Sequence, residues 1–277
     1  MKNRITMLLL LFGNLLAHGQ DNPGYLDLIK AERNLEDMFA SLYNPEIVTD
    51  KSGIFQRIDS TFLAALSIPG SFDYQWNKLD MIGKLTSSDQ RIRVFSWVWM
   101  VSPEQYRYSA YLQVQGKSDA SETFPLIQGD NENIKKEEYE QRLDDWHGKI
   151  YYDLVTTKYR RKTYYTLMGA DYNTSYTNMK SIEVVGLRRG HPVFLDQRFF
   201  DEGTVRDRVI FEYSSDVSMV LRFDERLGMI VFDHLAPLHP IYHGMYQFYG
   251  PDGSYDGYEF KEGLWVRKED VDARNER

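Results

Sequence analysis

The sequence predicts an α+β protein in which an N-terminal helical hairpin packs on a large antiparallel β meander, closed as a curved sheet, a sandwich or an open barrel. Three observations predict this class. Apolar residues recur at helical spacing between residues 20 and 70, and they alternate with polar residues from about residue 91 onward. The connections between the alternating segments are mostly short. Neighbouring strands must therefore be antiparallel, because a parallel crossover needs about a dozen residues or more.

Two segments with helical periodicity come first. Asn22-Pro23 offers a cap followed by a proline at the first helical position, Asn44-Pro45 ends the first segment, and Pro69-Gly70 ends the second. Such a helix pair can lie over an open sheet or dock on a partner protein, and the first arrangement needs fewer assumptions. The residues that share one face are Tyr25, Leu28, Ile29, Leu35, Met38, Phe39 and Leu42 in the first helix and Ile54, Phe55, Ile58, Phe62, Ala65 and Leu66 in the second.

The β part begins with a strand at Arg91 to Val101 that is apolar on both faces, followed by one at 106–114 with a single polar face. The charged segment Gln128 to His147 interrupts the alternation and is expected to be a surface excursion. Further strands are predicted at Lys149 to Thr157, Lys162 to Gly169, Met179 to Leu187, Pro192 to Phe199, Val205 to Tyr213, Val217 to Asp224 and Met229 to His234, with short ones at Tyr255 to Phe260 and Leu264 to Arg267.

The first residues have the pattern of a signal peptide. Lys2 and Arg4 precede the apolar run Ile5 to Leu16, which closes on Ala17-His18-Gly19. The run is too short to cross a bilayer, which needs about 20 apolar residues, so no transmembrane anchor is expected in the mature form. The predicted organisation is a signal peptide (1–19), the helical hairpin (20–70) and an antiparallel β domain (71–277) that forms one unit with the helices. The expected location is the periplasm or the medium.

The composition of the chain excludes several kinds of partner and of catalytic or metal site. The chain has 33 basic and 41 acidic residues, and removal of Lys2 and Arg4 with the signal peptide leaves 31 against 41, a formal charge of −10. This acidic net charge argues against nucleic acid as a partner. The basic run Lys158 to Lys162 is a local exception, and it is interpreted as a polar hairpin turn. The absence of cysteine excludes thiol nucleophiles, thiolate metal sites and disulfides.

One cluster has the composition of a metal site. Asp233, His234, His239 and His243 place four potential ligands of a divalent metal within eleven residues. His239 and His243 have helical spacing, but no glutamate lies between them to act as the base of a zinc protease, and Pro237 and Pro240 favour a loop. The alternative is histidines in an exposed loop after a strand. No cofactor is expected otherwise.

Aromatic and acidic residues suggest a second kind of site. The 20 tyrosines and five tryptophans could stack on sugars, although strands with one face on a core prefer the same residues. Trp97 and Trp99, with Asp252 and Asp256, are the candidates for a ligand groove.

Two runs of polar residues resemble the alternating oxygen ligands of a calcium loop, and in both runs a turn is the favoured interpretation. The first run is Asp252, Ser254, Asp256 and Glu259, and the second is Asp171, Asn173, Ser175 and Thr177.

Several stretches together resemble a family of exported proteins from Bacteroidota bacteria, for which no activity is assigned. They are Leu79 to Met100, Ile150 to Gly169, Phe232 to Pro237, Phe248 to Asp256 and Asp270 to Asn275. The resemblance covers most of the mature chain and implies an export route and a shared fold. The acidic excursion at 130–145 departs from that family's pattern, in which this segment is shorter.

The sequence lacks the Gly-x-Ser-x-Gly elbow, the P-loop and the dinucleotide fingerprint. The leading hypothesis is therefore a non-catalytic periplasmic or secreted binding or envelope-associated module, whose partner is a small molecule, a glycan or an envelope protein. The alternative is an exported metal- or carboxylate-dependent hydrolase centred on the late histidines and the Asp252/Asp256 loop. A third possibility is a structural protein whose helix pair docks on an envelope partner.

Overall fold

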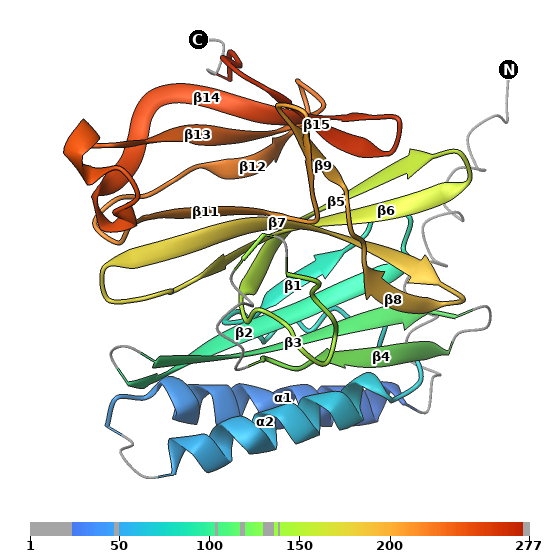
Figure 1. Cartoon of the computed structure of the whole chain (residues 1–277). Coiled ribbons are helices and arrows are strands. Elements are labelled where there is room, and N and C mark those ends of the chain that lie inside the picture. Colours follow the sequence, from blue (N-terminus) through green and yellow to red (C-terminus); the bar gives the residue numbers. More distant parts are fainter. Residues whose placement is uncertain are drawn as a thin grey trace, which may run out of the picture. The chain divides into compact units, whose positions relative to one another are not determined.

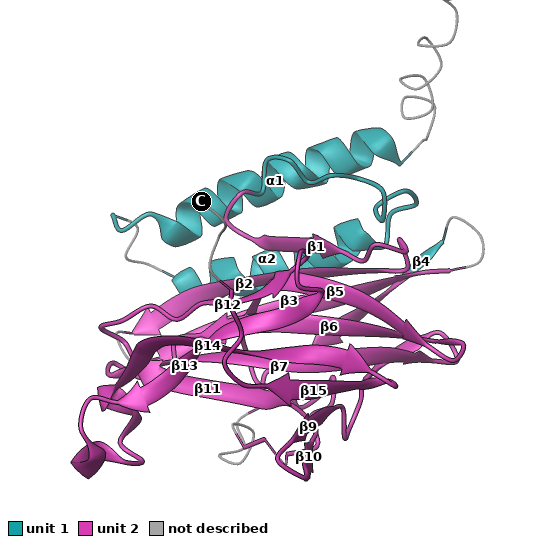
Figure 2. Cartoon of the chain, turned by 90° about the horizontal axis from the view of Figure 1, so that it is seen from above, with its two compact units in different colours: residues 1–79, 117–121 teal, residues 80–116, 122–277 magenta. Residues whose placement is uncertain are grey.

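The computed structural model of the chain describes residues 24–46, 50–102, 105–116, 120–129, 136–137 and 139–273. The predicted signal peptide and the Asn22-Pro23 cap lie outside these residues. The chain divides into two compact units, residues 1–79 with 117–121 and residues 80–116 with 122–277 (Figure 2). Each unit is described by itself below.

The first unit contains the predicted helix pair, α1 (Tyr25–Tyr43) and α2 (Lys51–Leu66). The buried residues of each helix follow the predicted spacing, so the apolar face was identified correctly. The carboxylate of Asp50 caps α2 by accepting a hydrogen bond of 3.1 Å from the Gly53 amide. In α1, the buried Glu32 accepts hydrogen bonds from the Tyr74 hydroxyl and the Lys78 amide, which ties the segment after α2 to α1.

The second unit consists of three sheets (Figure 1). The first has the order β1 (Gly83–Thr86), β2 (Ile92–Ser102), β3 (Gln105–Gln115), β4 (Ser121–Leu126). The second has the order β11 (Val209–Ser214), β7 (Thr177–Arg188), β6 (Lys162–Asp171), β5 (Ile150–Tyr159), with β8 (His191–Phe194) also paired to β7. The third has the order β10 (Thr204–Arg206), β9 (Phe199–Asp201), β15 (Leu264–Lys268), β14 (Tyr249–Lys261), β13 (Met229–Pro237), β12 (Leu221–Asp224).

The sheet that contains β5, β6 and β7 is the middle layer of this unit (Figure 1). Alternate residues of β6 belong to different cores. Tyr164 and Met168 pack in a cluster with Phe232 and other residues of the third sheet, whereas Tyr165 and Leu167 pack in a cluster with residues of the first sheet. Because successive side chains of a strand point to opposite faces, a sheet buried on both faces carries apolar residues throughout.

The α+β class and the antiparallel pairing within the β part are confirmed. The described strand pairs include one exception to the antiparallel rule, since β15 pairs with β9 in parallel. The first half of β2 is buried on both faces, as predicted, with Val94 and Phe95 at most 1% exposed. The second half is not, since Met100 is 56% and Val101 is 40% exposed. The packing of the helix pair on a sheet stays a prediction.

Three of the predicted strands are interrupted. The chain leaves β8 in the middle sheet and enters β9 in the third sheet across residues 195–198, and it returns from β10 to β11 across residues 207–208. The predicted strand from Val217 begins only at Leu221, because Val220 is bonded to Asp233 instead: its amide donates to the Asp233 carboxylate and its carbonyl accepts from the Asp233 amide. Within the described residues, no helix is both long and apolar enough to cross a membrane.

Candidate functional site

Two of the predicted site residues form a direct pair. β13 and β14 are antiparallel neighbours with a register shift between Asp233 and Leu235, and this shift lies beside His234. His234 Nδ1 lies 2.9 Å from Asp256 Oδ2. Asp256 also accepts a 2.8 Å hydrogen bond from Arg267 Nη2. Burial raises the pKa of Asp256, but the hydrogen bonds from His234 and Arg267 outweigh it, so the net shift is downward.

The pair belongs to a chain of alternating charges. Arg267 also donates to Asp201 at 3.0 Å, Asp201 lies 3.7 Å from Arg206, and Arg206 in turn pairs with Glu137. Part of this chain lines a cavity of about 200 Å³ together with Asp233 and His234. Three of the residues singled out from the sequence, Asp233, His234 and Asp256, therefore lie around one cavity. Arg206 and Arg267 pair with three of the four carboxylates that line this cavity, whereas Asp233 accepts from the Val220 amide. The half-exposed imidazole of His234 is a side chain of the kind that serves as a general acid or base.

The other two histidines of the predicted metal cluster lie elsewhere. His239 caps the short 3₁₀ helix η2 (Pro240–Tyr242) by accepting from the Ile241 amide, and His243 follows this helix; both are exposed. The Asp233 carboxylate accepts a 2.6 Å hydrogen bond from the Val220 amide. Among the described residues, no three His, Asp or Glu side chains are arranged to hold a metal ion.

The predicted ligand groove is not assembled either. Trp97 is fully buried and packs on the Tyr111 ring, with centroids 5.6 Å apart, so it is a core residue. Trp99 is half-buried on the same strand. Asp252 is exposed, and its carboxylate accepts from the Ser254 amide and hydroxyl, as expected of a turn. Asp256 lies at the His234 cavity described above.

A buried ionic cluster was not identified from the sequence. Lys149 is completely buried, and its ammonium donates to Glu183 and to the Ser181 hydroxyl. The other Glu183 oxygen accepts from the Tyr151 hydroxyl at 2.7 Å. Burial raises the pKa of Glu183, but the nearby Lys149 and Arg208 outweigh it and keep the carboxylate ionised. The signal was present in the sequence, since Glu183 interrupts the apolar stretch Ile182 to Leu187.

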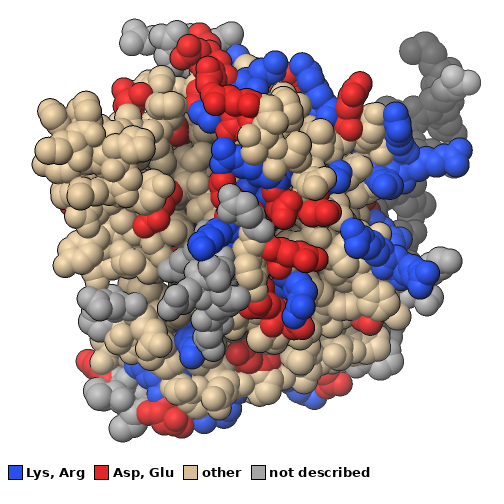
Figure 3. All heavy atoms as spheres, in the orientation of Figure 1, with Lys and Arg blue, Asp and Glu red and all other residues tan. Residues whose placement is uncertain are grey.

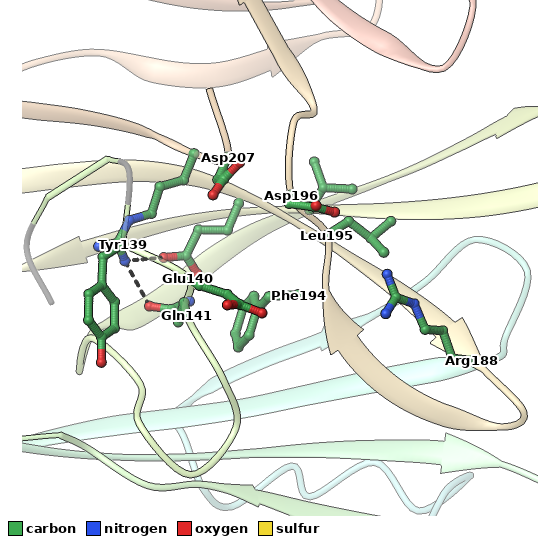
Figure 4. Close-up of a pocket in the computed structure, with 11 residues that line it drawn as sticks. Tyr139, Glu140, Gln141, Arg188, Phe194, Leu195, Asp196 and Asp207 are labelled. Carbon is green, nitrogen blue, oxygen red and sulfur yellow. Dashed lines mark hydrogen bonds and ion pairs between the residues drawn. The ribbon is translucent and has the colours of Figure 1, made fainter. Parts of the chain in front are cut away.

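Glu183 and Arg208 also line a small cavity of about 120 Å³ (Figure 4). Arg208 donates to the Gln141 side chain at 2.9 Å and lies 3.9 Å from Glu183. Gln141 accepts in addition from the His147 amide. In Figure 4, Tyr139 and Gln141 lie on one side of this cavity, and Arg188 lies on the other side. The ionic groups of the cluster bind one another, so we interpret it as part of the fold's interior.

An aromatic groove of about 630 Å³ lies between the β6–β7 connection and the segment around η3 (Tyr246–Phe248). Tyr176 from the first segment is 68% exposed and Tyr246 from the second is 46% exposed. Uncharged polar residues make up most of the remaining lining, and Glu212 is the one charged residue in it; the polar lining consists of Asn173, Thr174, Ser175, Thr177 and Gln247.

Hydrogen bonds fix the wall of this aromatic groove. The Asn173 amide group and the Thr177 hydroxyl both donate to Glu212, at 2.9 and 2.8 Å. The Ser215 hydroxyl binds the Ser175 carbonyl, and the Ser215 amide binds the Tyr176 carbonyl. The connection that carries Tyr176 is thus attached to β11 and to the loop after it. An exposed ring on a fixed loop is suited to binding, because little conformational freedom is lost when a ligand stacks on it.

The sequence pattern pointed to this loop for a different reason. Asn173, Ser175 and Thr177 resemble part of a calcium loop, and a turn is the favoured interpretation. Asn173 and Ser175 do lie in the connection between β6 and β7, and Thr177 is the first residue of β7. The groove itself was missed because Tyr176 and Tyr246 are 70 residues apart, and nothing local in the sequence indicates that they share a cavity. Comparison of the chain with protein-family models, with curated proteins and with solved structures finds no match.

Proposed function

We propose that this protein is a non-catalytic binding module, exported to the periplasm or the medium, and that it binds a neutral glycan in the aromatic groove. The observation that supports this most is the presence of two exposed tyrosines, Tyr176 and Tyr246, in one groove lined by hydroxyl and amide side chains. Aromatic rings offer an apolar face to the C–H groups of a sugar ring, and hydroxyl and amide groups bind its hydroxyls.

The size and charge of the groove agree with this ligand class. Its volume falls in the range of about 300–1,000 Å³ that is usual for small-molecule sites. Its one carboxylate, Glu212, already accepts hydrogen bonds from Asn173 and Thr177. The chain as a whole carries a formal charge of −8, so an anionic glycan would be repelled, whereas a neutral one would not.

Affinity electrophoresis tests the proposal. The protein should be retarded in native gels that contain at least one of xylan, mannan, β-glucan and starch. Tyr176→Ala or Tyr246→Ala should weaken the affinity by about fivefold, since one stacked ring contributes on the order of 1 kcal/mol. Tyr176→Phe keeps the ring and should retain most of the binding.

Tyr43→Ala is the matched control, because Tyr43 is an exposed tyrosine of α1, outside the groove. It should bind as the unaltered protein does. The proposal would be contradicted if the protein bound none of the four polysaccharides and no glycan of a neutral glycan array. It would also be contradicted if Tyr176→Ala and Tyr246→Ala both bound as tightly as the unaltered protein.

A hydrolase is the second candidate function, and the His234–Asp256 pair favours it. A carboxylate that binds Nδ1 orients the imidazole and leaves Nε2 free to accept a proton from water. A panel of chromogenic ester and glycoside substrates tests this function. Turnover that is lost in His234→Gln, with an unchanged melting temperature, would replace the binding function by catalysis; no turnover on any substrate is the result we expect.

A further inference from the structure

A second cavity, of about 550 Å³, differs from the aromatic groove in its charge. Five cationic side chains line it: Arg91, Arg161, Lys162, Arg188 and Arg198. Two carboxylates, Asp89 and Asp196, also line this basic cleft, so its formal charge is +3. This is the opposite sign to that of the whole chain.

The positive charge of the basic cleft is not neutralised within the described part of the chain. None of its five cations forms an ion pair there. Arg198 instead donates to two backbone carbonyls, those of Asp196 and Gly263. Asp89 accepts from the Ser87 and Tyr165 hydroxyls and from the Arg91 amide, so uncharged donors occupy its oxygens.

Two turns bring most of these cations together. β6 begins at Lys162 and its antiparallel neighbour β7 ends at Arg188, so the β5–β6 turn and the β7–β8 turn lie at the same end of the middle sheet. Lysine and arginine side chains gather over the ends of these strands on the right of Figure 3. The sequence had suggested that the basic run Lys158 to Lys162 was a polar turn; the structure confirms the turn and adds cations from three other segments.

The backbone of the β5–β6 turn is poorly matched to its residues. Tyr159 pairs with Lys162, which leaves Arg160 and Arg161 as the two central residues, with φ of 54° and 102°. Turns of this type favour Asn-Gly, because a side chain with a Cβ is strained at positive φ. Residues that break a local rule of this kind are often kept for function rather than for folding.

We propose that the basic cleft binds a ligand that carries two phosphate groups, either a soluble bisphosphate or the bisphosphorylated headgroup of a lipid. A phosphate monoester has a charge of about −1.5 to −2 at pH 7, so two of them match the +3 of the cleft. Arginine is the commonest cation here, and its planar fork binds two phosphate oxygens at once. The cleft has few neutral donors and its tyrosines, Tyr164 and Tyr165, are buried, so charge rather than stacking selects the ligand.

This site is separate from the aromatic groove. The groove uses the connection from β6 to β7, whereas the basic cleft lies at the other end of the same two strands. Strands of about ten residues span roughly 33 Å at about 3.3 Å per residue, so the two ligands would not touch. Binding at one site therefore does not depend on the glycan hypothesis for the other.

Isothermal titration calorimetry with fructose 1,6-bisphosphate, fructose 6-phosphate and fructose tests the soluble source. We expect the bisphosphate to bind at least tenfold more tightly than the monophosphate, and fructose not to bind. Co-sedimentation with phosphatidylcholine vesicles containing phosphatidylinositol 4,5-bisphosphate, compared with vesicles containing phosphatidylinositol 4-phosphate, tests the lipid source. Preference for the bisphosphorylated compound in either assay supports the proposal, and the assay in which it occurs identifies the source.

Three substitutions test whether this binding takes place in the basic cleft. Arg188→Gln should weaken it about tenfold, and Lys268→Gln, which removes an exposed cation of β15 that does not line the cleft, should leave it unchanged. Arg161→Gly should weaken binding while the melting temperature stays the same or rises, because glycine accepts the positive φ. Absence of binding in both assays, equal binding of mono- and bisphosphates, or binding that all three variants retain would overturn the proposal.

Discussion

At the scale of single residues, Lys149 is the least expected feature of the interior. An ammonium group that is fully removed from water is costly, and its ion pair with Glu183 offsets that cost only while both partners are present. The stem of Lys149 also passes over Gly169, where an added Cβ would lie 2.7 Å from Lys149 Cδ. Both the charge and the packing of this side chain are therefore fixed by its neighbours.

Replacing Lys149 by methionine should lower the free energy of unfolding by about 3–5 kcal/mol, because the buried carboxylate of Glu183 loses its closest cation. Urea denaturation measures the change. Lys261→Met is the matched control: Lys261 pairs with Glu259 while both side chains are partly exposed, so its loss should cost under about 1 kcal/mol. Equal losses in the two variants would show that the buried pair contributes no more than a surface pair.

Asp256 makes stability depend on pH. Its folded-state pKa is below the unfolded value of about 3.9, so the stabilisation is present above about pH 4 and is lost as the pH falls through the folded pKa. Asp256→Asn should therefore be less stable than the unaltered protein at pH 7, and the difference should shrink at pH 3. Urea midpoints at the two pH values measure this. A difference that is the same at both values would contradict the role given to the carboxylate.

At the scale of elements, the helices were predictable because their determinants are local. The spacing of apolar residues identified the buried faces, and prolines marked the ends. The strands were predictable as alternating segments but not in their limits. β8, β10 and β11 end where the chain changes sheet, and alternation within a strand carries no information about the identity of its partner.

The cap of α2 gives a prediction at this scale. Asp50→Ala should cost about 1–2 kcal/mol in urea denaturation, since it removes the acceptor for the Gly53 amide and leaves alanine at a φ of 52°. Asp50→Asn should cost much less, because asparagine caps helices and tolerates this backbone conformation. If both variants lost the same stability, the negative charge rather than the cap geometry would be the stabilising feature.

At the scale of the whole molecule, function depends on contacts that the sequence does not display. The sequence brought Asp233, His234 and Asp256 to attention, and the structure places these three around one cavity because β13 and β14 are neighbours. It gave no indication of the Tyr176–Tyr246 groove or of the basic cleft, because each is assembled from loops at the ends of strands far apart in the chain. Conversely, Trp97 was a conspicuous residue of the sequence and lies in the core.

The central claim is that the aromatic groove is the glycan site, and two-dimensional NMR of the ¹⁵N-labelled protein tests it most directly. Titration with the oligosaccharide repeat of the polysaccharide that retards the protein should shift the amide signals of residues 173–177 and 244–247 first. Shifts that are confined to the surroundings of His234 or to the basic cleft, with the groove signals unchanged, would contradict the claim.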